Sequence, residues 1–240
     1  MFKDTTIVFD LDGTLVDTAP DLTNALNEVL TRRGHAAVPA ETIRACVGHG
    51  ARIMIEEALR RAGAEDDVDR MLAEFLVHYE ANIAAESRPF PGAVAALEDL
   101  AAQGATLAVC TNKREYLSRR LLQALRIDHH FSAIAGRDTF AVSKPDPGHL
   151  TGAIALAGGD PSRAVMIGDS EVDLRTAKAA AIPVILVSFG YATSPLDGVA
   201  PEAVIDHFDE LAARAYALLN GAAPGASERL RRLNPAADQA

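Results

Sequence analysis

Thr6-Ile7-Val8-Phe9-Asp10-Leu11-Asp12-Gly13-Thr14 is the stretch from which both the fold and the chemistry of this sequence can be argued. Its first four residues, all apolar or β-branched, are typical of a short strand buried on both faces of a parallel sheet. Asp10 and Asp12 follow, and in an extended segment side chains two positions apart point to the same side. The two carboxylates are therefore expected to converge at the carboxyl end of a strand, where open α/β sheets place their sites.

Similar short runs recur along the chain and indicate the other strands of one sheet. The clear ones are residues 106–110, 164–167 and 184–187, and the weaker ones are 131–135 and 203–205. Helical patterns lie between them, at residues 93–102, 117–125, 150–156 and 174–181. Strands that alternate with helices predict an α/β fold with a Rossmann-like parallel sheet covered by helices on both faces.

Residues 17–87 interrupt this alternation and contain no strong strand pattern. They favour three or four helices, at residues 21–33, 41–46, 52–62 and 67–85, separated by glycines. The sequence therefore predicts a core domain of residues 1–16 and 88–220, with an all-helical insertion, 17–87, after the first strand. The last segment, 221–240, is rich in Ala, Pro and Arg and is expected to be a frayed helix or a flexible tail.

The composition is that of a globular protein and narrows the range of partners. Of 240 residues, 49% are hydrophobic and 23% are charged, and the formal net charge is −10. This charge argues against a nucleic-acid partner, but not against a small anionic substrate whose site holds a metal ion. Cys46 and Cys110 form no CxxC pair, which excludes a zinc ribbon or a thioredoxin-like motif. With no secretory leader and no membrane span in the pattern, we expect a cytoplasmic monomer or homodimer without a membrane partner.

Three further polar motifs follow the two aspartates along the chain. They are Thr111-Asn112-Lys113 after one predicted strand, Ser143-Lys144-Pro145-Asp146-Pro147 before a helix, and Gly168-Asp169-Ser170-Glu171-Val172-Asp173 after another strand. Each has an ordinary alternative: a helix N-cap, a solvated loop lysine, an acid-rich helix start or, for the first pair, an Asp-Gly turn. Together they predict a site for Mg²⁺ and phosphate, since Mg²⁺ prefers oxygen ligands and offsets the repulsion between carboxylates.

These four motifs, in this order, resemble those of the haloacid dehalogenase superfamily of aspartate-nucleophile phosphatases. The resemblance implies that Asp10 is the nucleophile and that Asp12 is the general acid and base. It also implies that Thr111 and Lys144 bind the transferring phosphoryl group. The Mg²⁺ ligands that it implies are Asp10, the backbone carbonyl of Asp12, Asp169 and, directly or through water, Asp173. The acid at Asp12 favours a phosphatase or a phosphomutase over a dehalogenase.

The helical insertion resembles the small cap of this superfamily, which closes over the substrate and selects the leaving group. A finer resemblance, to the bacterial phosphoglycolate phosphatases, is carried by residues 47–52, 88–92, 111–113, 187–191 and 203–206. Arg114 and Ala181 depart from that pattern, because Pro and Gly are common at these positions. The resemblance implies Mg²⁺-dependent hydrolysis of 2-phosphoglycolate, a small phosphorylated metabolite, through an aspartyl-phosphate. The residues expected to bind the substrate are Gly13, Thr14, His49, Gly50, Arg52, Asn112 and Lys113.

Two questions stay open at this point. The loop at residues 48–52 either reads the substrate carboxylate, through His49, Arg52 and nearby backbone N–H groups, or only ends one helix and begins the next. The substrate is either 2-phosphoglycolate or another small phosphate, as for a sugar phosphatase, a pyrophosphatase or a phosphoglucomutase-like enzyme. A non-catalytic protein that binds phosphate or a metal is a further alternative.

Overall fold

The computed structural model describes residues 1–191 and 199–221. Its centre is a six-stranded sheet in the order β5-β4-β1-β6-β7-β8, in which every neighbouring pair is parallel. The strands are β1 (Thr6–Phe9), β4 (Thr106–Cys110), β5 (Ala133–Ala135), β6 (Ala164–Gly168), β7 (Val184–Val187) and β8 (Ala203–Ile205). The predicted α/β fold is confirmed. The predicted tail, 221–240, lies outside the described residues except for Gly221.

The pairing of β1 decides where the polar motifs meet. Phe9, its last residue, lies beside Val109 of β4 on one side and Ile167 of β6 on the other. The three strands therefore end at the same edge of the sheet, and the residues that follow each of them are brought together there.

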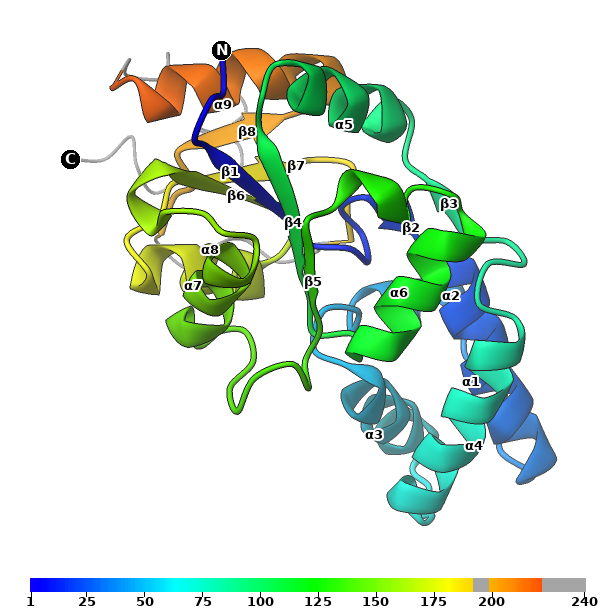
Figure 1. Cartoon of the computed structure of the whole chain (residues 1–240). Coiled ribbons are helices and arrows are strands. Elements are labelled where there is room, and N and C mark those ends of the chain that lie inside the picture. The colour runs from blue at the N-terminus through cyan, green and yellow to red at the C-terminus, as the bar shows by residue number, and fades with distance from the viewer. Residues whose placement is uncertain (192–198, 222–240) are drawn as a thin grey trace.

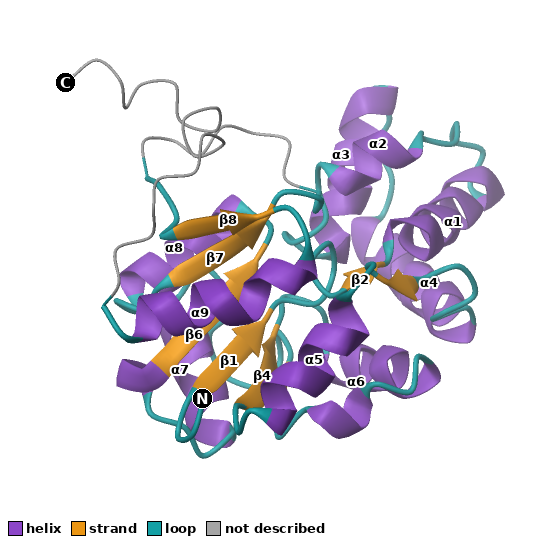
Figure 2. Cartoon of the chain, turned by 90° about the horizontal axis from the view of Figure 1, so that it is seen from above, coloured by secondary structure: helices purple, strands orange, loops and turns teal. Residues whose placement is uncertain are grey.

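Alternation along the strands divides the apolar side chains between two cores. On β1, Ile7 and Phe9 pack with α5 (Ala93–Ala102), α6 (Glu115–Ala124) and α9 (Leu211–Leu219). Val8 points the other way, towards α7 (Pro147–Leu156) and α8 (Glu171–Ala179). Figure 2 shows α5 and α9 in front of the sheet and α7 and α8 behind it. Burial on both faces explains why these strands are apolar throughout.

Four helices form a separate layer beyond the carboxyl edge of the sheet (Figure 1). They are α1 (Ala19–Arg32), α2 (Ala40–Arg44), α3 (Ala51–Ala62) and α4 (Val68–Ala81). A ribbon joins this layer to the sheet: β2 (Val16–Asp17) pairs antiparallel with β3 (Arg88–Pro89). The chain therefore leaves the core and returns to it at adjacent points. This ribbon was not predicted from the sequence, since two-residue strands show no periodicity.

The predicted helices are present, and their ends differ. α4 ends at Ala81 rather than near residue 85, because the Asn82 side chain donates to the carbonyl of His78 and the backbone turns there. α9 was not predicted from the sequence. Three short 3-10 turns, η1 (Asp128–His130), η2 (Pro161–Arg163) and η3 (Phe208–Glu210), complete the elements. None of the helices described has both the length and the apolar surface that a bilayer crossing requires.

Candidate active site

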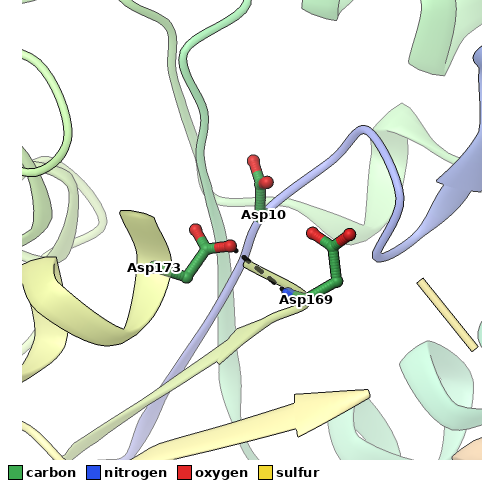
Figure 3. A group of neighbouring side chains, drawn as sticks. All are labelled: Asp10, Asp169 and Asp173. Atoms are coloured by element: carbon green, nitrogen blue, oxygen red, sulfur yellow. Dashed lines mark hydrogen bonds between the residues drawn. The ribbon is translucent and has the colours of Figure 1, made fainter. Parts of the chain in front are cut away.

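Three carboxylates meet at the edge where β1 and β6 end. Asp10 follows β1, Asp169 follows β6 and Asp173 lies in the first turn of α8 (Figure 3). One oxygen from each lies within 4.8 Å of the others, and all three side chains are buried. The structure thus brings three of the acids singled out in the sequence together, and their chemical roles are taken up below.

The cluster carries more negative charge than its surroundings offset. Burial raises the pKa of Asp10 to about 6, although the nearby Lys144 ammonium opposes this rise. Burial also raises the pKa of Asp169 well above its usual range, and repulsion from Asp173 and Asp10 adds to the rise. Oδ1 of Asp10 is buried and forms an ion pair with Lys144. Three buried carboxylates around one lysine make an oxygen-only donor set with excess negative charge, which fits a hard divalent cation such as Mg²⁺.

Lys144 is the cation that the protein itself places in this cluster. Its Nζ lies 2.9 Å from Oδ1 of Asp10 and donates to Oδ1 of Asp173 at 2.6 Å. Burial alone would lower the pKa of Lys144, but the attraction of Asp10 and Asp173 outweighs burial and raises it. Lys144 is therefore charged, and its ammonium is the neighbour that a phosphate on Asp10 would meet.

His149 supports the loop that carries Lys144. Its Nδ1 accepts from the Lys144 backbone N–H at 3.2 Å, and its Nε2 lies 3.0 Å from the Gly136 carbonyl. Burial, together with repulsion from the Lys144 ammonium, lowers the pKa of His149 to about 4. The imidazole is therefore neutral, with its proton on Nε2. Nothing in the sequence indicates this role, because the spacing of His149 matches no ligand pattern.

Asp173 is held as part of the N-terminal cap of α8. Its Oδ2 accepts from the Ser170 N–H at 3.1 Å, and its own N–H donates to the Ser170 hydroxyl oxygen at 3.4 Å, which makes a capping box. The Ser170 hydroxyl also donates to Oδ2 at 2.6 Å. The Asp169 N–H also lies 3.3 Å from the same oxygen (Figure 3). With Oδ1 bound to Lys144, Asp173 has donors on both oxygens, so it orients the cluster through its neighbours.

Asp169 is fixed by residues from two distant segments. Thr14 donates its hydroxyl to Oδ1 at 3.3 Å, and the Tyr191 N–H donates to Oδ2 at 2.7 Å. Gly13 has a φ of +85°, and a Cβ on it would lie 2.5 Å from Asp169 Oδ2. A Cβ on Gly190 would lie 2.2 Å from the Asp169 Cβ. Gly13 and Thr14, expected from the sequence to bind substrate, thus enclose Asp169.

Asp12 lies outside the three-carboxylate cluster. Its oxygens accept from Lys113 Nζ at 2.9 and 3.1 Å, and Oδ1 also accepts from the Thr18 hydroxyl at 2.7 Å. The metal contact predicted for Asp12 is made by its backbone carbonyl, so it does not require the Asp12 carboxylate to lie in the cluster. Lys113 lies over the ring of Tyr79, 4.6 Å from the centroid. Burial would lower the pKa of Lys113, but the Asp12 carboxylate and Tyr79 raise it.

A cavity of about 250 Å³ lies above Asp10 and Asp12, between the sheet edge and the helical layer. Its core side includes Thr111, which is buried at the end of β4, and Lys113. Its other side is built from α1, α3 and α4, by apolar or aromatic residues: Leu22, Met54, Leu72, Phe75, Leu76 and Tyr79. A small ester with its phosphate at Asp10 would have its leaving group inside this cavity.

Asn112 forms hydrogen bonds to both sides of the cavity. Its Nδ2 donates to the Gly48 carbonyl at 2.9 Å and to the Lys144 carbonyl at 3.1 Å. Both amide protons are therefore used within the protein, which leaves the buried Oδ1 without a partner. Asn112, expected from the sequence to bind substrate, holds the 48–50 loop against the core.

Of the helical-layer residues expected to bind the substrate, two line the cavity and one does not. Gly50 and Arg52 line the cavity. The Arg52 guanidinium pairs with Asp69 of α4 and remains partly exposed. His49 is exposed and is not among the residues that line the cavity. The structure thus brings Asp10, Asp12, Thr111, Lys113 and Lys144 to one place, and leaves His49 outside it.

Comparison with known proteins identifies a family whose members resemble this chain. The family model for haloacid dehalogenase-like hydrolases matches residues 7–187. The phosphoglycolate phosphatase of Mesorhizobium japonicum is 52% identical over 208 residues, which cover 85% of this chain and 92% of that protein. The phosphoglycolate phosphatase of Agrobacterium fabrum is 46% identical over 207 residues, with coverage of 85% and 89%.

A solved structure shows the same arrangement of elements. The crystal structure of a predicted phosphoglycolate phosphatase from Haemophilus somnus superimposes with a TM-score of 0.82 at 29% sequence identity. The superposition covers 89% of this chain and 98% of that one. The family model, from Ile7 to Val187, includes strands β1 to β7, the acidic cluster and the helical layer. This chain therefore belongs to the haloacid dehalogenase-like hydrolase family, and within that family it is a phosphatase.

Proposed function

We propose that this enzyme hydrolyses 2-phosphoglycolate to glycolate and phosphate through an aspartyl-phosphate on Asp10, with Mg²⁺ as cofactor. The observation that carries the chemistry is that Asp10 and Asp12 line the same cavity but have different neighbours. Asp10 lies in the acidic cluster beside Lys144, and Asp12 lies on the side where the leaving group would sit. The substrate is supported by the relatives, which are named for phosphoglycolate at up to 52% identity.

In the first half of the reaction an Asp10 carboxylate oxygen bonds to phosphorus. The bond from phosphorus to the bridging oxygen breaks, and protonated Asp12 gives its proton to that oxygen, so glycolate leaves. Thr111 and Lys144 hold the phosphoryl oxygens while this happens. When bound by Asp10, the Asp12 carbonyl and Asp169, Mg²⁺ would neutralise charge on the phosphoryl group.

In the second half Asp12 acts as a base. It takes a proton from a water molecule whose oxygen bonds to phosphorus, and the bond between phosphorus and Asp10 breaks. Phosphate leaves, and Asp10 returns to its carboxylate form while Asp12 keeps the proton for the next cycle. The aspartates thus divide the work, because only Asp10 lies in the cluster that would attract the phosphate once Mg²⁺ is bound.

The helical layer supplies the closed environment for these steps. We assign residues 17–87 to a cap and residues 1–16 with 88–220 to the catalytic core. The cap closes the cavity with apolar side chains from α3 and α4, and the bond from Asn112 to Gly48 holds it against the core. Exclusion of water protects the aspartyl-phosphate until the leaving group departs.

A substrate panel tests the proposal. Released phosphate would be measured for 2-phosphoglycolate, sugar phosphates, pyrophosphate and an aryl phosphate, with Mg²⁺ and with a chelator. We expect 2-phosphoglycolate to have the highest kcat/KM and the chelator to abolish turnover. Greater turnover of another compound would replace the substrate, and an isomer in place of phosphate would indicate a mutase.

The covalent step has its own test. We expect Asp10→Asn to lower turnover by about a thousand-fold or more, because the amide does not attack phosphorus. Asp99→Asn is the matched control, since Asp99 lies in α5 away from the cavity. Acid-quenched wild-type enzyme with radiolabelled phosphate on the substrate should carry label on the Asp10 peptide. Label elsewhere, or none under single-turnover conditions, would contradict the aspartyl-phosphate.

A further inference from the structure

The cavity above Asp10 and Asp12 is unevenly charged. Its cap side is mainly apolar, and the cation that it contributes, Arg52, already holds Asp69. A carboxylate that entered this side would lose its hydration and would find backbone N–H groups of the 48–52 loop, but no unpaired cationic side chain among the described residues. A free side-chain cation for a second anionic group on the substrate is therefore sought on the core side of the cavity.

The core side presents two arginines whose guanidinium groups have no partner in the described part of the chain. Arg114 and Arg137 both line the cavity, and both are exposed enough to meet a ligand. Within residues 1–191 and 199–221, the side chain of neither forms an ion pair or a hydrogen bond. Most other arginines in those ranges hold a carboxylate or a carbonyl, as Arg33 holds Asp66 and Glu74. With a net charge of −10, the chain does not lack acids to pair with them.

Arg137 is held where the cap and the core meet. The backbone N–H of Arg137 donates to the Lys113 carbonyl at 2.8 Å, so the loop that carries Arg137 lies beside the loop that carries Lys113. Nη1 of Arg137 lies 2.9 Å from the point that a Cβ on Gly50 would occupy. The first turn of α3, which begins after Gly50, contains no acidic side chain that could take the guanidinium. The guanidinium therefore reaches the cap and finds no protein anion there.

We propose that Arg137 binds the carboxylate of the leaving group, with Arg114 as a second cation beside it. This assignment rests on the proposed function, because it needs a substrate with a carboxylate beyond the bridging oxygen. Thr111 and Lys144 hold the phosphate at the strand ends, and the rest of the ester extends into the cavity that Arg137 lines. A guanidinium offers paired N–H donors in the geometry of a carboxylate. The cap loop then encloses the carboxylate, and the core arginines recognise it.

The test compares two substrates that differ only at this group. Ethyl phosphate carries a methyl where 2-phosphoglycolate carries its carboxylate. We expect Arg137→Ala to lower kcat/KM for 2-phosphoglycolate by about 10- to 100-fold, the worth of a lost charged hydrogen bond, and to change ethyl phosphate by less than about threefold. Arg137→Lys should retain part of the preference, because an ammonium keeps the charge and loses the paired donors.

Arg126→Ala is the matched control. It also removes a guanidinium without a partner in the described ranges, but one that does not line the cavity, so both kcat/KM values should stay unchanged. An unchanged preference for 2-phosphoglycolate in Arg137→Ala and in the Arg114→Ala, Arg137→Ala double variant would overturn the assignment and leave the proposed function standing. A wild-type enzyme that does not prefer 2-phosphoglycolate would overturn the proposed function, and the assignment with it.

Discussion

The ammonium of Lys144 lies 2.6 Å from Oδ1 of Asp173 and joins the loop before α7 to the first turn of α8. The same ammonium lies 2.9 Å from Asp10, so a single cation faces two carboxylates while Asp169 is bound only by neutral donors. Burial raises the pKa values of Asp10 and Asp169, and repulsion among the carboxylates adds to the rise, so the site is sensitive to both protons and divalent cations.

Stabilisation by Mg²⁺ should depend on pH. The pKa of Asp10 is raised to about 6, and that of Asp169 is also raised, so between about pH 4 and that value the folded protein holds protons that the unfolded chain has released. Without metal, these two groups therefore contribute less to stability as pH rises through this window. Mg²⁺ takes the place of the protons, so we expect it to raise Tm more at about pH 8 than at about pH 5. Asp169→Asn should lose most of this increment, and an equal increment at both pH values in the wild type would contradict the account.

His149 should make the protein acid-sensitive. Its folded pKa, about 4, lies below the 6.5 of an unperturbed histidine, so the unfolded chain binds a proton first as pH falls. The resulting stability is present above about pH 6.5 and is lost as pH falls towards 4, by an amount on the order of 3 kcal/mol. We expect the urea midpoint of His149→Gln to fall less over this window than that of the wild type. His129→Gln, at an exposed site, should behave as the wild type does, and a wild-type slope in His149→Gln would disprove the assignment.

Gly190→Ala should damage catalysis through Asp169. The added Cβ would lie 2.2 Å from the Asp169 Cβ and 2.6 Å from the Gly13 carbonyl, so the carboxylate must move. A displacement near 1 Å at a reacting group costs about a hundred-fold in rate, and we expect kcat/KM to fall by about that factor. Gly158→Ala is the contrast, because nothing lies near its Cβ and its φ of +78° penalises only the backbone. Equal activity losses in the two variants would show that the crowding around Asp169 is not the cause.

Asp21 should be essential to the end of the cap, where the chain returns to the core. Its carboxylate accepts from the Ser87 hydroxyl at 2.6 Å, from the Ser87 N–H at 2.8 Å and from the Glu86 N–H at 3.0 Å. Asp21→Ala leaves these buried or half-buried donors without a partner, and we expect a loss of about 3 kcal/mol in the free energy of unfolding. Ser87→Ala removes only one of the bonds and should cost about 1 kcal/mol in urea denaturation. A loss in Asp21→Ala no larger than that in Ser87→Ala would refute this role.

Local patterns in the sequence were enough to predict the sheet and the placement of the acids. β1, β4 and β7 are continuous apolar runs because helices cover both of their faces, and such runs are visible without a structure. Asp10 and Asp169 were predicted to meet because each directly follows a strand, and parallel strands end at one edge. Here the sequence position alone carries the spatial information.

The contacts that orient the acids were not predictable in the same way. Tyr191 reaches Asp169 and also receives the Thr18 N–H at 2.7 Å, although these residues are far apart in the chain. His149 and Arg137 lie in segments whose local patterns are those of a plain helix and a plain loop. Partners of this kind depend on how the elements pack, which strand and helix periodicity does not specify.

The ribbon of β2 and β3 has a consequence for protein engineering. Both crossings between the two layers fall within one antiparallel ladder, where Val16 lies opposite Pro89 and Asp17 opposite Arg88. A foreign insert spliced at this ladder would begin and end at neighbouring points, so closing it would require little extra loop entropy. The reacting aspartates precede that junction or lie well after it. Grafting other lids onto this scaffold is therefore a direct route to new substrate ranges with the hydrolytic machinery left in place.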